Sequence, residues 1–390
     1  MYSRLFCPHT MSIPYAQSVP RKPLSLAVIG AWLGRARYHD ALLSQPEIKV
    51  VAIVDTDDDN RMAKGWSRDI PGRPAIFGSL ESLLQAPITV EALLVAPKVS
   101  ERYAAISAAV LAGISVLTEF PISTSLAETA QVIEAAGAAG IQISPSADYR
   151  YHAAVAAMRE AIDGGAIGTP ERVKCELSFP INATYALENG MIPESLDWYD
   201  LLQTVAFRTI DISSSWLGPP RAVNADIDLP HHAAIAGRRA QDPIANLIVT
   251  HTEGRTSTHL LKLSRSMHPS ERYLLAGDLG TLELVLHAGE ATATTMLGPY
   301  LRLHQKGVGQ SPITLMEPPE EIDMLPLGTE RMLAEFVRRC HAEESDSTEI
   351  LSLLAAMETV YGGFLSAREG IRMPLPLQNP PDIDALLQPE

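Results

Sequence analysis

The chain has 390 residues, of which 46% are hydrophobic and 20% are charged, and its formal net charge is −15. This composition is typical of a globular protein with room for two cores, and it excludes an intrinsically disordered chain. The negative charge disfavours nucleic acid and anionic membranes as partners, because both are polyanions.

The cysteines and the N-terminal residues indicate the cellular compartment. Cys7, Cys175 and Cys340 are far apart and form no CxxC pair, so we predict neither a metal site nor a disulfide framework. Such a set suits a reducing compartment, and no apolar run approaches the roughly 18 residues that span a bilayer. We therefore expect a cytoplasmic protein. Residues 1–22 contain prolines that would break an amphipathic helix, and they predict a disordered or arm-like leader.

From Leu24 onward, short apolar runs alternate with alanine-rich helical stretches. The runs predict strands at residues 25–29, 49–54, 92–96, 115–118 and 141–143, with helices over 103–112 and 128–139 among those between them. Continuous apolar strands that alternate with helices indicate a parallel sheet covered on both faces. We predict an α/β domain over residues 23–147.

After about residue 150 the pattern changes to consecutive strands. They are predicted at 172–179, 222–227, 244–252, 257–263, 272–276, 281–286 and 300–303, with helices over 151–163, 200–217 and 329–368. Strands that follow one another without helices between them predict an open antiparallel or mixed sheet. We therefore expect a second, α+β domain over residues 148–376, followed by a tail over 377–390.

Short segments in a fixed order carry a resemblance to a known family. They are Val28-Ile29-Gly30 with Asp55, Glu119-Phe120-Pro121, residues 161–170 (AIDGGAIGTP), Thr209-Ile210-Asp211 with residues 216–218 (WLG), and residues 276–282 (AGDLGTL). Together they resemble the Gfo/Idh/MocA family of NAD(P)-dependent oxidoreductases, in the branch that includes the yeast galactose-pathway repressor. The resemblance implies an N-terminal Rossmann domain, a C-terminal open-faced sheet, a substrate pocket between them, and a homo-oligomer formed through the open sheet.

The chain departs from this family at the positions that handle the substrate's proton. Where the family has Glu-Lys-Pro, this chain has Glu119-Phe120-Pro121; Glu119 is expected beside the cofactor, but Phe120 has no group that could donate a proton. The family's Asp and His, four positions apart on one helix, align with Thr204 and Arg208. Threonine is not a base, and arginine stays protonated. Arg102 stands where the family often has a histidine.

The arginines suggest a different use of the predicted cleft. Arg102, Arg150 and Arg208 could converge there, with Tyr149 and Tyr151 nearby, and bind a carboxylate, phosphate or enolate oxygen through charge-assisted bonds. In the alternative interpretation, each arginine pairs with a local acid such as Asp211 and only holds the fold. Asp211 itself is also a candidate for substrate binding. Further aromatic residues could line the pocket or pack as core: Tyr185, Trp198 and Tyr199.

The predicted cofactor loop also departs from the family pattern. Gly30 and Gly34 fit a dinucleotide loop in part, but Trp32 occupies the position of the second glycine, which lets the backbone approach the pyrophosphate. Trp32 could form a pocket wall, block the diphosphate, or pack on a rearranged loop. Arg35 could contact a phosphate, and Asp55 is the candidate ribose-binding acid. The acidic residues after Asp55 would favour NAD over NADP if either cofactor binds.

Three functions remain open on these observations. The first is a non-redox cyclase, pericyclase, isomerase or lyase of secondary metabolism, in which Phe120 and Trp32 shape the pocket and an arginine polarises an oxygen. The second is an NAD(P)-dependent oxidoreductase with another proton donor, such as Tyr149. The third is a ligand-sensing transcriptional regulator. All three bind a small molecule, and none requires a metal.

Overall fold

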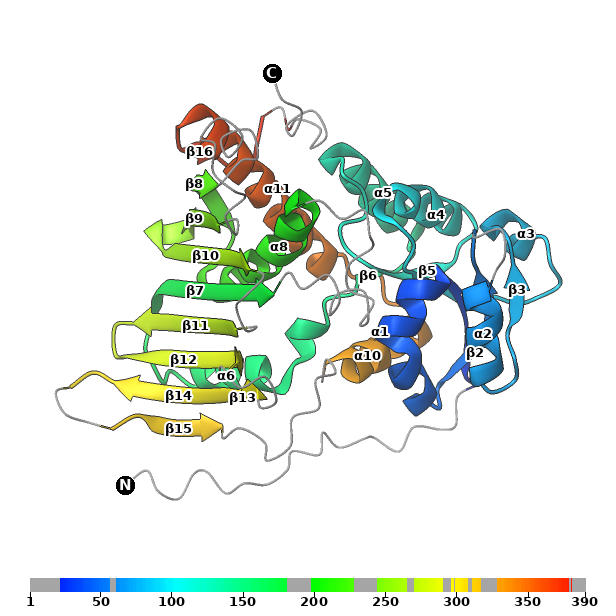
Figure 1. Ribbon diagram of the computed structural model, residues 1–390, viewed down its shortest axis with the longest axis horizontal. Helices are drawn as coiled ribbons and strands as arrows, with labels where there is room; N and C mark the ends of the chain where they lie inside the picture. The colour runs from blue at the N-terminus through cyan, green and yellow to red at the C-terminus, as the bar shows by residue number, and fades with distance from the viewer. Residues whose placement is uncertain are drawn as a thin grey trace.

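The first domain is built on a six-stranded sheet in the order β3-β2-β1-β4-β5-β6, and its neighbouring strands pair in parallel (Figure 1). The strands are β1 (Leu24–Ile29), β2 (Ile48–Val54), β3 (Ala75–Phe77), β4 (Ala92–Val95), β5 (Ser115–Thr118) and β6 (Ile143–Pro145). The predicted parallel sheet is confirmed, although the short β3 was not predicted. The strand order reverses between β1 and β4, and such a switch point is where open α/β sheets bind ligands.

The structure is a computed structural model that describes residues 22–56, 61–180, 198–227, 244–264, 270–289, 296–297, 299–307, 311–316, 328–378 and 380. Helices cover both faces of the first sheet: α1 (Ala31–Ser44) and α2 (Arg61–Asp69) on one side, and α3 (Leu80–Leu84), α4 (Val99–Leu111) and α5 (Leu126–Ala139) on the other. Along β1, Leu26 and Val28 face the α1 side while Ala27 and Ile29 face the opposite side. Burial on both faces explains why the strands read as continuous apolar runs.

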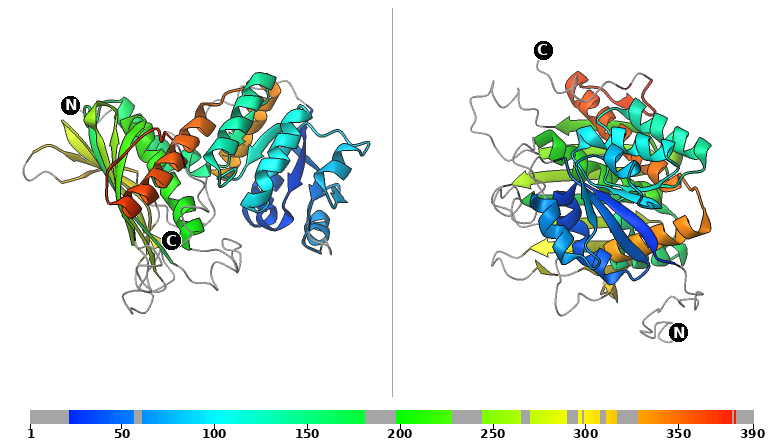
Figure 2. Two further views of the ribbon diagram at one scale, coloured as in Figure 1. Left: turned by 90° about the horizontal axis from the view of Figure 1, so that it is seen from above. Right: turned by 90° about the vertical axis from the view of Figure 1, so that its right-hand side faces the viewer.

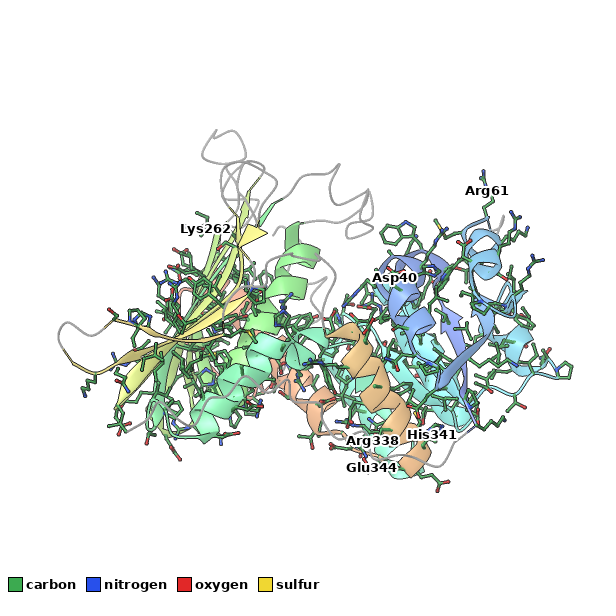
Figure 3. The ribbon with its side chains drawn as sticks, turned by 90° about the horizontal axis from the view of Figure 1, so that it is seen from below. Asp40, Arg61, Lys262, Arg338, His341 and Glu344 are labelled. Atoms are coloured by element: carbon green, nitrogen blue, oxygen red, sulfur yellow. The ribbon has the colours of Figure 1, made fainter. Side chains whose placement is uncertain are left out.

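The chain returns to the first domain near its C-terminus. Helix α10 (Thr329–Ala342), which the sequence placed in the second domain, packs against α1. Its inner side chains share one buried cluster with Tyr38 of α1: Met332, Leu333, Phe336 and Val337. At the far end of α10, Arg338 pairs with Glu344 at 2.8 Å on the surface (Figure 3). The core of the first domain is therefore completed by a segment that lies far from it in sequence.

The second domain contains a ten-stranded sheet in the order β15-β14-β12-β11-β7-β10-β9-β8-β16, with β13 paired to β12. Its strands are β7 (Pro170–Pro180), β8 (Pro220–Ile227), β9 (Ile244–His251), β10 (Thr256–Ser264), β11 (Ser270–Gly277), β12 (Gly280–Gly289), β13 (Met296–Leu297), β14 (Tyr300–Gln305), β15 (Ile313–Met316) and β16 (Met373–Pro374). β7 and β10 pair in parallel, whereas β11 pairs with β7 and with β12 in antiparallel fashion. The sheet is thus mixed, as predicted.

Helices lie on one face of this sheet, between it and the first domain (Figure 2). They are η1 (Asp148–Tyr151), α6 (Ala153–Asp163), α8 (Trp198–Leu217) and α11 (Thr348–Glu369), and a short turn, η2 (Thr252–Gly254), follows β9. The single helix predicted over 151–163 is divided at His152, whose Nδ1 accepts a bond from the backbone N of Ala154 at 3.1 Å and caps α6. By length and composition alone α11 could cross a bilayer, but 67% of its most apolar window is buried inside the protein.

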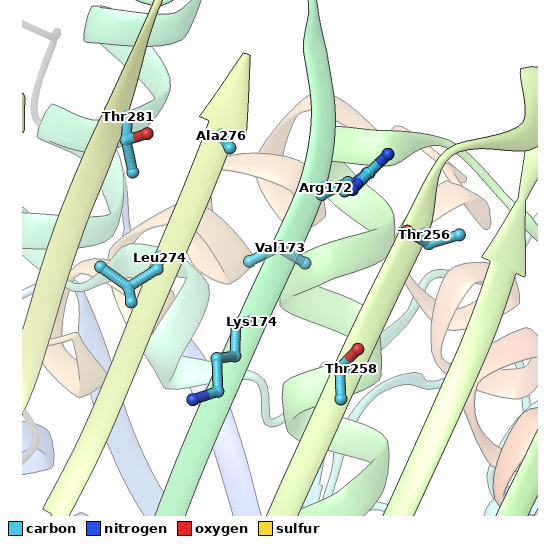
Figure 4. Close-up of a pocket in the computed structure, with 8 residues that line it drawn as sticks. All are labelled: Arg172, Val173, Lys174, Thr256, Thr258, Leu274, Ala276 and Thr281. Carbon is cyan, nitrogen blue, oxygen red and sulfur yellow. The ribbon is translucent and has the colours of Figure 1, made fainter. Parts of the chain in front are cut away.

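The opposite face of the second sheet carries no described helix and has a shallow hollow of about 360 Å³ (Figure 4). Arg172 and Lys174 of β7 line this hollow together with threonines and apolar side chains of neighbouring strands: Thr256, Thr258, Leu274, Ala276 and Thr281. These side chains alternate with the inward-facing ones that pack under α8. The hollow therefore lies on the side of the sheet away from the interdomain residues that the sequence singled out.

Candidate functional site

The turn between β1 and α1 lies directly on the end of β4. Gly30 has φ +88°, and a Cβ there would lie 2.4 Å from the carbonyl O of Ala96, so glycine is required. Helix α1 begins at the next residue, Ala31. The loop between β1 and α1 is therefore the single residue Gly30, and the first turn of α1 supplies backbone N–H groups that have no intrahelical partner.

The other residues of the predicted phosphate loop lie within α1. A Cβ on Gly34 would meet Val28 Cγ1 at 2.9 Å and the Trp66 ring at 3.0 Å, so Gly34 permits the close helix–strand packing that the third glycine of the motif provides. Trp32, in the first turn, is 38% exposed. Arg35 forms an exposed ion pair with Asp69 at 2.9 Å instead of extending alone toward a ligand.

These residues fit a nicotinamide dinucleotide in their main features. Gly30 brings the turn onto the switch point, α1 presents its N-terminus there, and Asp55 directly follows β2, where the ribose-binding acid of such folds stands. Trp32 is the departure, because an indole replaces the glycine that gives a pyrophosphate access to the backbone. The acidic residues that would favour NAD over NADP lie at 57–59, outside the described residues.

Glu119 lies in a buried polar network on the inner side of α1. Its carboxylate accepts hydrogen bonds from Arg37 Nη1 at 2.6 Å and from the hydroxyl of Tyr38, which also lies 2.5 Å from Ser146 Oγ. Arg37 further donates to Asp148 at 3.2 Å. Burial, and then the neighbouring Glu119 charge, raise the pKa of Tyr38 well above its ordinary value. Glu119, expected beside the cofactor, is thus already bound by two side chains of α1 that the sequence had not suggested.

Phe120 forms an apolar contact between the two domains. It is 5% exposed, and its ring meets that of Phe207 in α8 edge to face, with 5.0 Å between centroids and 67° between planes. Arg102 supports this segment from below: its Nε donates to the Pro97 carbonyl at 3.0 Å and its Nη1 to the Pro121 carbonyl at 2.8 Å. These donors of Arg102 are therefore bound to backbone oxygens, neither to an acid nor to a ligand.

Asp211 joins η1, α8 and α11. Its carboxylate accepts bonds from Tyr149 at 2.8 Å, from Arg150 Nε at 2.8 Å and Nη2 at 2.5 Å, and from Ser352 at 2.7 Å. With four donors on a side chain that is 1% exposed, Asp211 has little capacity left for a substrate. This geometry matches the alternative in which Arg150 holds the fold. Tyr151 points elsewhere, to Glu349 of α11 at 3.0 Å.

Arg208 is held from two sides at the junction of the domains. Its Nη2 donates to Glu271 of β11 at 2.8 Å, and its guanidinium carbon lies 5.3 Å from the centre of the Tyr149 ring. Glu271, which the sequence did not single out, also accepts a bond from Tyr273 at 2.6 Å. The only feature of the sequence that could have pointed to Glu271 is a charged residue at a position of β11 whose side chain faces the inside of the protein. The Nε of Arg208 is buried and has no hydrogen-bond partner among the described residues.

Tyr149 and Arg208 at this junction each keep one protonation state near neutral pH. Burial, and then the charge of Asp211, raise the pKa of Tyr149 well above its ordinary value. Burial opposes the charge of Arg208, but Glu271 and its other neighbours raise the pKa of this guanidinium above its ordinary value. Tyr149 and Arg208 therefore keep their protons, so they can donate hydrogen bonds but cannot act as bases.

Several predicted site residues are described only in part or not at all. Trp198, Tyr199 and Thr204 belong to α8, and Thr204 lies one turn before Arg208, but the side chains of these three are outside the described set. Tyr185 also lies outside the described residues. Within the part of the chain that the structure describes, no three His, Cys, Asp or Glu side chains are grouped to hold a metal ion.

Comparisons with known proteins agree with this architecture. Residues 24–146 match the Gfo/Idh/MocA oxidoreductase family model, an NAD-binding Rossmann fold. D-apiose dehydrogenase of Paraburkholderia graminis is 23% identical over 337 residues, which cover 83% of this chain and 82% of that protein. Inositol 2-dehydrogenase 3 of Saccharopolyspora erythraea is 26% identical over 211 residues, covering 53% and 57% respectively. The crystal structure of an Agrobacterium radiobacter oxidoreductase with NAD+, L-tartaric acid and magnesium has a TM-score of 0.71 at 17% identity, over 94% of this chain and 100% of that one.

Proposed function

With residues 24–146 identified as an NAD-binding Rossmann domain of the Gfo/Idh/MocA oxidoreductase type, we propose that this protein uses the two-domain scaffold for a non-redox reaction of a small molecule. The reaction class is that of a cyclase, pericyclase, isomerase or lyase. The observation that carries the proposal is the edge-to-face contact of Phe120 with Phe207, because it fills the place of the family's proton-donating lysine with an apolar wall.

In this proposal the cleft works by shape and by one fixed hydrogen-bond donor. Phe120, Phe207 and Trp32 would exclude water and hold an apolar substrate in a reactive conformation. Arg208, oriented by Glu271 and Tyr149, would donate to an oxygen on which charge develops. A single preorganised donor of this kind contributes about 2.7–4 kcal/mol to the stability of a transition state. Within this class, a pericyclic reaction needs no residue that exchanges a proton at neutral pH.

The second candidate is an NAD(P)-dependent oxidoreductase, and the names of the related dehydrogenases favour it. Gly30, the N-terminus of α1 and Asp55 would hold the cofactor, whose nicotinamide accepts or donates a hydride when bound. Tyr149 would be the proton donor in place of lysine, because its raised pKa keeps its hydroxyl protonated. A ligand-sensing regulator of the galactose-repressor type is the third candidate, and it would bind a sugar without turning it over.

Assembly and location are part of the same proposal. We place the protein in the cytoplasm, and we expect a homo-oligomer formed through the open face of the second sheet, where Ile244 and Ile248 of β9 are 42% and 49% exposed. Size-exclusion chromatography with light scattering tests this assembly, since a monomer at micromolar concentration contradicts it.

The decisive experiment measures hydride transfer directly. Wild-type protein is incubated with NAD or NADP and either D-apiose or inositol, the compounds in the names of the two relatives, and absorbance of the reduced nicotinamide is recorded. We expect no reduction. Phe120→Lys should also stay inactive, because Thr204 and Arg208 replace the Asp and His of the family. Phe207→Lys is the matched control, since it places a lysine on the other side of the same ring contact. Reduction by the wild type overturns the non-redox proposal, and saturable sugar binding without any turnover favours the regulator.

A further inference from the structure

Arg208 differs from the other arginines at the domain junction in how its donors are used. Arg150 places both Nε and Nη2 on Asp211, and Arg102 places Nε and Nη1 on two backbone carbonyls. Arg208 is bound through Nη2 to Glu271, and its buried Nε has no partner among the described residues. A buried donor left without an acceptor is unfavourable, so an oxygen that reached it would restore the missing hydrogen bond.

The charge of Arg208, by contrast, is already balanced. Glu271 is 3% exposed and lies 2.8 Å from the guanidinium, while its other oxygen accepts the Tyr273 hydroxyl. The neighbouring cation, Arg150, is balanced by Asp211 in the same way. A second carboxylate beside Arg208 would therefore meet Glu271 as a like charge in a poorly hydrated place, where such repulsion is strong. What the site lacks is an acceptor, not a negative charge.

Besides its charged partner Glu271, Arg208 has aromatic neighbours. Its guanidinium lies over the Tyr149 ring, and the adjoining residue Phe207 meets Phe120 across the domain junction. The side chain of Arg208 is 30% exposed although its Nε is buried, so a ligand would enter at the exposed part of this side chain and come to lie against the buried donor. An aromatic or alicyclic ring that bears one acceptor oxygen matches both the rings and the single donor.

We infer that Arg208 Nε binds a neutral carbonyl oxygen of an apolar ligand, and that Glu271 is the residue that makes the site prefer a carbonyl to a carboxylate. The inference rests on the proposed function for the location of the ligand, but not on the reaction that follows. It narrows the substrate class from any anionic or polar oxygen to ketones, aldehydes, lactones or quinones carried on an apolar ring.

Two probes of similar shape test it: acetophenone, which has a neutral carbonyl on a phenyl ring, and benzoate, which has a carboxylate there. Dissociation constants are measured by ligand-observed NMR with the full chain at pH 7. Wild type should bind acetophenone more tightly than benzoate. In Glu271→Gln the uncompensated Arg208 should tighten benzoate about tenfold, equivalent to about 1.4 kcal/mol, while the acetophenone constant changes less than about twofold.

Three further variants separate this effect from damage to the fold. Glu271→Asp keeps the negative charge and should keep the preference for acetophenone. Glu283→Gln removes an equally buried glutamate that pairs with Arg272 and His304 on the outward face of the sheet, and should leave both constants unchanged. Arg208→Gln should weaken acetophenone. Melting curves identify any variant that fails to fold, and if Glu271→Gln does so, the loss of acetophenone affinity in Arg208→Gln carries the comparison.

The outcomes are distinct from those of the hydride-transfer assay. Tighter binding of benzoate than of acetophenone by the wild type, an unchanged ratio in Glu271→Gln, or failure of both probes to bind overturns the carbonyl inference. Each of these results leaves the non-redox proposal to be judged by nicotinamide reduction alone. Conversely, reduction of NAD by the wild type would end the non-redox proposal without changing the probe ratio.

Discussion

Asp211 provides the sharpest test of whether the arginines at the junction hold the fold. Its side chain is 1% exposed, and it receives four hydrogen bonds, two of them from Arg150. Removing one partner of a buried ion pair typically costs 3–5 kcal/mol, because it leaves an uncompensated charge. Arg150 is 20% exposed and can recover some hydration, so for Asp211→Ala we expect a loss of about 3 kcal/mol.

Urea unfolding followed by tryptophan fluorescence measures this loss as a shift in midpoint at constant slope. Asp211→Asn keeps the volume and two acceptor sites, and should cost less, about 1.5–3 kcal/mol, which is the range for hydrogen bonds to a charged group. Asp69→Ala is the control, since its exposed pair with Arg35 should contribute at most about 1 kcal/mol. If Asp211→Ala loses no more than Asp69→Ala, Asp211 does not hold the fold and its assignment to substrate binding regains support.

Three smaller predictions concern the core and the cofactor loop. Burial lowers the pKa of His259 to about 3, so between roughly pH 6.5 and 3 the unfolded chain binds a proton that the folded chain does not. The His259 contribution to the free energy of unfolding should therefore fall by about 1.4 kcal/mol per pH unit on acidification, and His259→Gln should flatten the measured slope by that amount. Gly34→Ala should lower the free energy of unfolding by about 1–3 kcal/mol in thermal or urea unfolding, because the added methyl group would press on the Trp66 ring. A more stable variant would contradict this packing. Arg35→Ala should change the affinity for NADH by less than about twofold, or about 0.5 kcal/mol, because Asp69 already holds the guanidinium. Energy transfer from tryptophan to the nicotinamide measures this affinity, and a tenfold loss would show that Arg35 contacts a phosphate.

The strands were predictable where local pattern and environment agree. The apolar runs of β1, β2, β4 and β5 read directly as strands because both faces of the first sheet are buried. In the first domain, the elements that were missed, α2, β3 and α3, lie together between residues 61 and 84. β3 and α3 are too short to show a period, and α2 is mostly polar, with only Ala63, Trp66 and Ser67 buried.

The closeness of two candidate residues was predictable from the sequence, but the pairings of the charged side chains were not. Alignment of the family's motifs brought Phe120 and Arg208 to the same junction, and the structure has them near one another through Phe207. That Arg208 binds Glu271, 63 positions away, could not be read from the sequence, since register between distant strands and helices is set by packing. The same holds for the bond between Glu119 and Arg37, 82 positions apart.

The return of α10 to the first domain has a consequence for how such a protein can change during evolution. If recombination replaced residues 24–146 with those of a related protein, the new α1 would be shaped to pack against that protein's own C-terminal helix. It would instead meet Leu333 and Phe336 of the α10 that stays in this chain. We therefore expect the two domains to be inherited together, because the C-terminal part of the chain supplies a share of the interior of the first domain. Changes of chemistry in this chain would have to arise by substitutions in place, of the kind seen at Phe120 and Arg208, and not by exchange of whole domains.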